Sequence, residues 1–140
     1  MSFSNCYEDI TRAEAYATLE FRNTYHLAYR DLPAILSKHV RGRKGLDFGC
    51  GAGRSTRFLG RLGFEVTGVD IAEDMTRKAR ELDPSGDYRL VPGDDLSALQ
   101  TGSYDLVLAA FTFDNIAGRE KKFASLGTCA AFSTGMGNWC

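Results

Sequence analysis

A short apolar segment that runs into a glycine-rich turn constrains the fold of this chain more than any other feature. Residues 45–49, GLDFG, are typical of a buried strand, and GCGAGRS follows at residues 49–55. Residues 56–62 predict a helix that ends at Gly63. Gly51 and Gly53 permit a tight turn, and the helix start presents free N–H groups to polar atoms of a ligand. The segment therefore predicts a strand–loop–helix unit with a ligand site at the loop.

The alternation of strands and helices continues along the chain. Further strands are predicted at residues 64–70 (FEVTGVD), 88–93 (YRLVPG) and 104–111 (YDLVLAAF), and a helix at residues 72–82 (AEDMTRKAREL). The last strand is apolar enough to be buried on both faces. Such alternation is typical of a parallel sheet with right-handed crossovers. We therefore predict an α/β fold with a Rossmann-like doubly wound parallel sheet, incomplete and with four recognisable strands.

Segments of different character flank this core. Residues 1–44 predict an N-terminal helical arm in which Pro33 opens a second helix, residues 45–122 the ligand-binding domain, and residues 123–140 an atypical tail. AGREKKFASL is compatible with a helix start, but GTCAAFSTGMGNWC has no clear period, so we predict no regular structure from Gly127 onward. Without a recognisable fifth strand, the fourth is expected to leave an open sheet edge, where a homodimer can form.

Composition and charge exclude several classes of protein. Seventeen Lys and Arg against eighteen Asp and Glu give a net charge of −1, which provides no overall field for nucleic acid or an anionic membrane. No apolar run approaches the roughly 20 residues of a membrane span, and the start MSFSNCYEDI lacks a signal-peptide pattern. Four cysteines without a Cys-x-x-Cys pair and two histidines predict no metal site. We therefore expect a cytoplasmic protein with reduced thiols and no nucleic-acid or membrane partner.

Two acidic residues narrow the choice of ligand. Asp70 follows Gly49 by 21 residues and ends the second strand, where a carboxylate can accept both ribose hydroxyls of a nucleoside. A dinucleotide fingerprint requires Gly or Ala at its sixth place, which here is Arg54, so an NAD-linked oxidoreductase is disfavoured. Asp47 is costly inside an apolar strand unless it holds loop N–H groups or a cationic ligand. The sequence thus predicts a nucleoside-type cofactor at the loop.

The motifs DFGCGAGRS, GVDI and GDDL resemble those of class I S-adenosylmethionine-dependent methyltransferases. TYHLAYRDLP before the first strand and AFTFDNI after the fourth are similar to a subgroup of small-molecule-type methyltransferase domains, and the resemblance covers roughly residues 16–122. It implies S-adenosylmethionine as cofactor and a small molecule as methyl acceptor. The resemblance implies a sheet of seven strands, of which four are recognisable in this sequence. The chain therefore looks like a C-terminally truncated member of the family.

The resemblance also implies roles for matching residues. The glycine loop and Asp47 would surround the methionine part of the cofactor, Asp70 would bind its ribose, and Ile71 would pack on its adenine. The implied cofactor-binding set is Arg30, Asp47, Gly49, Gly51, Gly53, Asp70, Ile71, Asp94, Asp95, Leu96 and Phe111. Substrate contacts are implied for Thr112, Asp114 and Asn115. Which of Asp94 and Asp95 meets the adenine amino group stays open, and no catalytic residue is assigned.

Two functional hypotheses follow from the sequence. The first is a methyltransferase acting on a small molecule, because a methyl group on a sulfonium needs alignment and exclusion of water more than a protein nucleophile. The second is a non-catalytic module that binds S-adenosylmethionine or a partner and has lost its substrate-binding half.

Overall fold

The computed structural model describes residues 24–92, 95–112 and 117–133. Helices α2 (Thr24–Arg30) and α3 (Leu32–His39) precede the sheet, and Pro33 lies in the first turn of α3. Proline is tolerated there because the first turn of a helix leaves its N–H groups without intrahelical partners. The expectation that Pro33 opens a second helix is confirmed.

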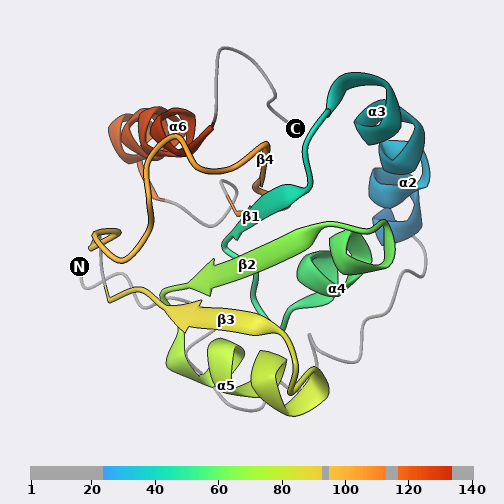
Figure 1. Cartoon of the computed structure of the whole chain (residues 1–140). Coiled ribbons are helices and arrows are strands. Elements are labelled where there is room, and N and C mark those ends of the chain that lie inside the picture. The colour runs from blue at the N-terminus through green and yellow to red at the C-terminus, as the bar shows by residue number, and fades with distance from the viewer. Residues whose placement is uncertain (1–23, 93–94, 113–116, 134–140) are drawn as a thin grey trace.

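Four parallel strands form a sheet in the order β3-β2-β1-β4 (Figure 1). The strands are β1 (Lys44–Phe48), β2 (Glu65–Asp70), β3 (Asp87–Leu90) and β4 (Leu106–Leu108). Helix α4 (Arg54–Arg61) connects β1 with β2, and α5 (Glu73–Leu82) connects β2 with β3. The predicted doubly wound parallel α/β architecture is therefore confirmed, with four strands.

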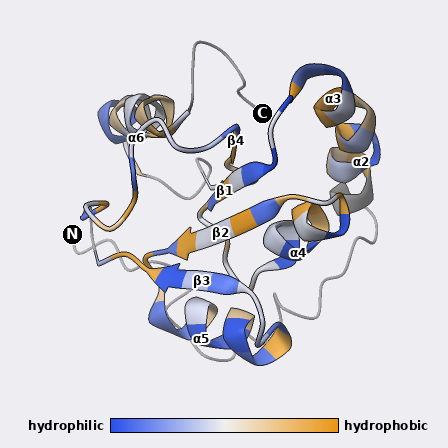
Figure 2. Cartoon of the chain, viewed as in Figure 1, coloured by the Kyte–Doolittle hydropathy of each residue, from blue (hydrophilic) through white to orange (hydrophobic). Residues whose placement is uncertain are grey.

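Two apolar clusters lie on opposite faces of this sheet. On one face, Leu36 of α3 and Leu59 of α4 pack with Leu106 and Leu108. The neighbouring side chain Val107 belongs to the cluster on the other face, because successive side chains of a strand alternate. The expectation that this strand is buried on both faces is confirmed. Figure 2 shows hydrophilic and hydrophobic residues alternating along α4 and α5, as expected of helices with one buried side.

Helix α6 (Arg119–Phe132) covers the second face and corrects the prediction made for the tail. No regular structure was expected from Gly127 onward, but α6 continues to Phe132. Cys129 and Phe132, three residues apart and therefore on one side of the helix, are 1% and 3% exposed. The Phe132 ring packs edge-on against Tyr104, with centroids 6.5 Å apart. Packing onto the sheet, and not a repeating apolar pattern, stabilises this end of the helix.

The chain returns from α6 to the outer side of β4. Ser133 forms an isolated parallel bridge with Tyr104. The N–H of Tyr104 donates to the carbonyl of Phe132 at 3.1 Å, while the N–H of Asp105 donates to Lys44 of β1 at 2.8 Å. Since these two donors point to opposite sides of the chain, Ser133 lies where a fifth strand would begin.

Candidate functional site

The loop between β1 and α4 lies at the carboxyl ends of the strands; we call residues 49–53 the glycine loop. Gly49, Gly51 and Gly53 have φ angles of +76°, +54° and +81°, a region that glycine adopts without steric cost. The N–H groups of Gly49 and Cys50 both donate to the Val69 carbonyl of β2, at 2.8 and 2.9 Å. The loop is therefore attached directly to the neighbouring strand.

The three glycines differ in what surrounds them. A Cβ atom at Gly53 would lie 2.7 Å from the ring of Tyr88 on β3, and a Cβ at Gly49 would overlap Thr112 beyond β4. At Gly51 the nearest atom outside its chain neighbours would be a sulfur 4.0 Å away. Gly49 and Gly53 thus allow the protein's own side chains to pack closely, whereas Gly51 leaves room for a ligand to approach the backbone.

Asp70, the last residue of β2, holds the glycine loop through its carboxylate. Its Oδ2 accepts the N–H of Gly51 at 2.8 Å, and its Oδ1 accepts the N–H of Ala72 at 2.9 Å. Burial raises the pKa of Asp70, and these N–H groups oppose the rise. Each carboxylate oxygen has two lone pairs, so the group keeps the capacity to accept hydroxyl donors in a fixed orientation.

Asp47 on β1 is completely buried, at 0% exposure. Ser55 and Thr56, in the first turn of α4, both donate their hydroxyls to its Oδ2, at 2.6 and 2.7 Å. Its Oδ1 has no hydrogen-bond partner in the described part of the chain. Burial raises the pKa of Asp47 to about 6, the two hydroxyls lower it, and nearby Asp70 raises it. A buried acceptor without a partner is costly, so a donor from a ligand would be stabilised at Oδ1.

Tyr29 brings helix α2 against the glycine loop. It is 5% exposed, and its ring meets Phe58 of α4 edge-on with centroids 5.0 Å apart. Burial and the charge of Asp47 raise the pKa of Tyr29, while Arg54 and a hydrogen bond with Ser55 lower it. A cavity of about 30 Å³ lies between Tyr29 and the loop, enough for about one or two water molecules. Helix α2 therefore contributes an aromatic wall to the site.

The structure brings much of the predicted set together. The predicted residues at the glycine loop and the adjacent strand ends are Asp47, Gly49, Gly51, Gly53, Asp70 and Ile71, the last 57% exposed. Phe111 follows β4 with a left-handed backbone, φ +61°. Thr112 donates its hydroxyl to the carbonyl of Phe48 at 2.7 Å. The carboxyl ends of β1, β2 and β4 thus meet at one edge of the sheet.

Other predicted residues have different surroundings. Arg30 is exposed and donates from Nε and Nη2 to the carboxylate of Asp31, at 2.9 and 2.8 Å. Asp95 is exposed and accepts the N–H of Ser97 at 3.0 Å, and Ser97 lowers the pKa of Asp95. Leu96 packs partly buried against the apolar cluster beneath α6. Asp94, Asp114 and Asn115 lie outside the described residues.

Four residues at this edge were not among the predicted site residues: Tyr29, Leu90, Ser55 and Thr56. Leu90 ends β3, pairs with Asp70 in the sheet and is 38% exposed, which adds a second apolar side chain at this edge. The two hydroxyls had a signal, because a buried carboxylate needs donors and these are the first hydroxyl groups after the loop. No sequence signal indicated Tyr29. The break between α2 and α3 interrupts the helical period, so the sequence does not show which side of α2 faces the loop.

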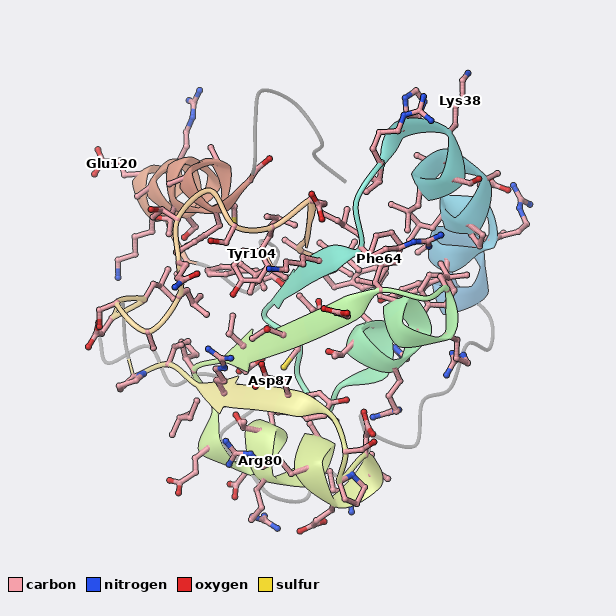
Figure 3. The ribbon with its side chains drawn as sticks, viewed as in Figure 1. Lys38, Phe64, Arg80, Asp87, Tyr104 and Glu120 are labelled. Carbon is pink, nitrogen blue, oxygen red and sulfur yellow. The ribbon has the colours of Figure 1, made fainter. Side chains whose placement is uncertain are left out.

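A larger cavity lies at the opposite end of the sheet. Its volume is about 940 Å³, and Phe64, Asp87 and Tyr104, labelled in Figure 3, are among its lining residues. Asp87 begins β3 and pairs with Arg89 at 2.7 Å. Ligands of open parallel sheets bind at the carboxyl ends of the strands, so we place the candidate site at the glycine loop. In the described ranges no three His, Cys, Asp or Glu side chains form a possible metal site, and no described helix is long and apolar enough to cross a membrane.

Comparison with known proteins connects this geometry to a family. A family model described as "Methyltransferase domain" matches residues 46–129, more than half of the chain. A ubiquinone biosynthesis O-methyltransferase of Bordetella avium is 38% identical over 76 residues, which cover 51% of this chain and 32% of that protein. The chain therefore spans about a third of the length of the curated relatives it matches.

Solved structures show the same fold. A putative S-adenosyl-L-methionine-dependent methyltransferase of Methanococcus maripaludis has a TM-score of 0.70 at 15% identity, covering 98% of this chain and 64% of its own. CalS10 of Micromonospora echinaspora, an amino pentose methyltransferase solved with SAM bound, has a TM-score of 0.67 at 20% identity, covering 94% and 54%. At these identities the likeness establishes the Rossmann-like fold alone.

Proposed function

The chain belongs to the methyltransferase domain family, and from this we propose that it binds S-adenosylmethionine at the glycine loop for methyl transfer to a small molecule. One observation carries the proposal: a fully buried carboxylate, Asp47, and a half-buried one, Asp70, lie on adjacent strands and flank a glycine loop that is open at Gly51. Asp70 keeps acceptor capacity beyond its two N–H partners, and Oδ1 of Asp47 has no hydrogen-bond partner among the described residues. The proposed ligand supplies matching donors, the ribose hydroxyls and the ammonium group of its methionine part.

The described residues fit the parts of this ligand. Asp70 would accept the ribose hydroxyls, since each of its oxygens accepts one backbone N–H. The backbone at Gly51 would lie against the methionine part, whose ammonium group would be bound by Asp47 Oδ1, directly or through one water. Ile71 and Leu90, both partly exposed apolar side chains, would contact the adenine.

The remaining residues proposed for cofactor binding are Arg30, Gly49, Gly53, Asp94, Asp95, Leu96 and Phe111, and those proposed for the acceptor are Thr112, Asp114 and Asn115. For Arg30 the cofactor carboxylate would replace Asp31, its present partner. Gly49 and Gly53 would act by shaping the loop, since their close neighbours are Thr112 and Tyr88.

The chain's contribution to the chemistry is binding, orientation and exclusion of water. Bound S-adenosylmethionine supplies a methyl group on a positively charged sulfur, ready for attack by an aligned nucleophile. Asp70 and the glycine loop would fix the cofactor, and Phe111 and Thr112 would border the acceptor. Tyr29, packed on Phe58 beside the loop, would restrict the access of bulk water to this side of the site. We assign no catalytic residue.

We further propose a cytoplasmic location and a homodimer formed along β4. Strand β4 is the last strand in the sheet order, and among the described residues Ser133 pairs beside it at Tyr104. The backbone groups of an edge strand can pair with a second chain. Analytical ultracentrifugation tests the homodimer. A monomer at every concentration would contradict it.

Isothermal titration calorimetry with S-adenosylmethionine, S-adenosylhomocysteine and NADH tests the proposed cofactor. We expect micromolar binding of the two adenosyl ligands and none of NADH. Asp70→Ala should weaken binding at least tenfold, whereas Asp87→Ala, the same change at the amino end of β3, should leave it unchanged. NADH binding, or full affinity in Asp70→Ala, would contradict the proposal.

A second measurement separates the enzyme from the non-catalytic module. The chain is incubated with methyl-labelled S-adenosylmethionine and a panel of small-molecule hydroxyl, amine and thiol acceptors. Label in any acceptor supports methyl transfer. Binding without transfer across the panel would favour the module.

A further inference from the structure

Thr112 joins the chain after β4 to the end of β1. Its hydroxyl donates to the carbonyl of Phe48 with an Oγ1–O distance of 2.7 Å, across 64 residues of sequence. The pairing of β1 with β4 ends at Asp47↔Leu108, so the Phe48 carbonyl lies one residue beyond the ladder. The Thr112 hydroxyl thus supplies a hydrogen bond at the point where the backbone pairing of the two strands stops.

The backbone on both sides of this contact is left-handed. Phe111 has φ +61°, which is strained for a residue with a bulky side chain. Gly49 has φ +76°, and a Cβ atom there would overlap the side chain of Thr112. Thr112 therefore packs directly on Gly49 and is hydrogen-bonded to its chain neighbour Phe48. These two interactions stabilise the strained turn and bring it against the glycine loop.

Strand β2 holds the glycine loop from the other side. The N–H of Gly49 donates to Val69 at 2.8 Å, and the N–H of Gly51 donates to Asp70 at 2.8 Å. The loop consequently lies between anchors on β2 and the Thr112 side chain beyond β4. Loss of the Thr112 donor would leave the Phe48 carbonyl without this partner and let the β4 side of the loop shift, while the anchors on β2 remain.

We infer that Thr112 is a positioning residue of the cofactor site, which acts through the backbone of Phe48 and Gly49 and not by donating its hydroxyl to the acceptor. This inference rests on the proposed function and adds the residue that sets the geometry of the loop. Valine at this position keeps the shape of threonine but has no donor, and serine keeps the donor but lacks the methyl group. The pair therefore separates the hydrogen bond from the packing.

Calorimetric titration with S-adenosylhomocysteine tests the inference on the wild type, Thr112→Val, Thr112→Ser and a control, Thr128→Val. The Thr128 hydroxyl of α6 donates to the carbonyl of Ala124 at 3.0 Å, so the control makes the same substitution and removes a threonine-to-backbone hydrogen bond that is exposed and lies within one helix. We expect Thr112→Val to bind about tenfold more weakly, and Thr112→Ser and the control to stay within about twofold. Wild-type affinity in Thr112→Val, or equal weakening in Thr112→Ser, would overturn the inference.

Amide NMR spectra of the ligand-free proteins test the position of the glycine loop without any ligand. The resonances of Gly49, Cys50 and Gly51 should move in Thr112→Val and stay near their wild-type positions in Thr112→Ser and Thr128→Val. Unmoved resonances in Thr112→Val would refute the inference. If the wild type binds no adenosyl ligand, the proposed function fails and the spectra alone decide the role of Thr112. If Thr112→Val does not fold, Thr112→Ala replaces it, with the same expected loss of affinity and the same expected shift of the loop resonances.

Discussion

Replacing Asp47 by asparagine should stabilise the folded chain at neutral pH and weaken the proposed cofactor binding. The carboxylate is fully buried, and its Oδ2 accepts the hydroxyls of Ser55 and Thr56. Asparagine has nearly the same shape, and its carbonyl oxygen can accept both hydroxyls without placing a charge in the interior. Its amide nitrogen replaces Oδ1, which has no partner among the described residues, so unpaired N–H groups offset about 1–2 kcal/mol of the gain.

The magnitude follows from the pKa of Asp47. The fold raises it to about 6, whereas an unfolded aspartate titrates near about 3.9. Below about pH 4 the carboxyl is protonated in both states and contributes nothing. Between about pH 4 and about pH 6 the folded state binds more protons, so the free energy of unfolding falls as pH rises, by about 3 kcal/mol in total. The asparagine variant lacks this loss, which leaves it about 1–2 kcal/mol more stable at neutral pH.

Urea unfolding of both proteins at several pH values between about 4 and about 7.5 measures this difference. The variant should be the less stable protein at the acid end and the more stable one at neutral pH, so that the two curves cross near about pH 5. Asp87→Asn is the control, because Arg89 holds the pKa of Asp87 below its ordinary value and the stability that Asp87 contributes is lost only below about pH 4. The curves of this control and the wild type should therefore stay parallel over the whole range. Parallel curves for wild type and Asp47→Asn would refute the reasoning, and undiminished S-adenosylmethionine binding by the variant would refute the role given to Oδ1.

Two further changes test the packing around the site and the tail. Gly53→Ala should lower the free energy of unfolding by about 2 kcal/mol or more, because φ is +81° and the new Cβ would lie 2.7 Å from Tyr88. Its control is Gly60→Ala in α4, where a Cβ would meet nothing within 4 Å. This change should raise the free energy of unfolding by up to about 1 kcal/mol. Similar urea midpoints for the two variants would contradict this. Phe132→Ala should cost about 3–5 kcal/mol, because Phe132 is 3% exposed and packs on Tyr104. A loss below about 1 kcal/mol would show that α6 does not cover the sheet.

The order of strands and helices was predictable from the sequence, but the ends of the strands were not. The predicted strand at residues 88–93 stops at Leu90, because Pro92 has no N–H to donate to a ladder. The predicted strand at 104–111 stops at Leu108, before the chain turns at Phe111 with a positive φ. Such a backbone is uncommon for an aromatic residue, so nothing in the local sequence indicates the turn.

The candidate site was predictable where it depends on spacing along the chain. The spacing of 21 residues between Gly49 and Asp70 in the sequence predicts a carboxylate beside the loop. In the structure Asp70 accepts the N–H of Gly51. The need for glycine at positions 49 and 53 could not be predicted, because the side chains that lie against them, Thr112 and Tyr88, come from distant parts of the chain. Side chains that approach through the tertiary fold leave no periodic trace in the sequence.

The two carboxylates of the site, Asp47 and Asp70, indicate the charge of the ligand that the site would bind. Burial raises the pKa of both Asp47 and Asp70, so at neutral pH each ionised carboxylate makes the ligand-free fold less stable than its protonated form would. Backbone N–H groups donate to both oxygens of Asp70, whereas the described residues donate hydroxyls to Oδ2 of Asp47 and nothing to its Oδ1. A cationic ligand at the other oxygen would favour the ionised form of Asp47 and thereby lower its pKa. Such a ligand would offset a cost that the chain alone does not, and for this reason a nucleoside with a positively charged tail fits this edge of the sheet better than a neutral one.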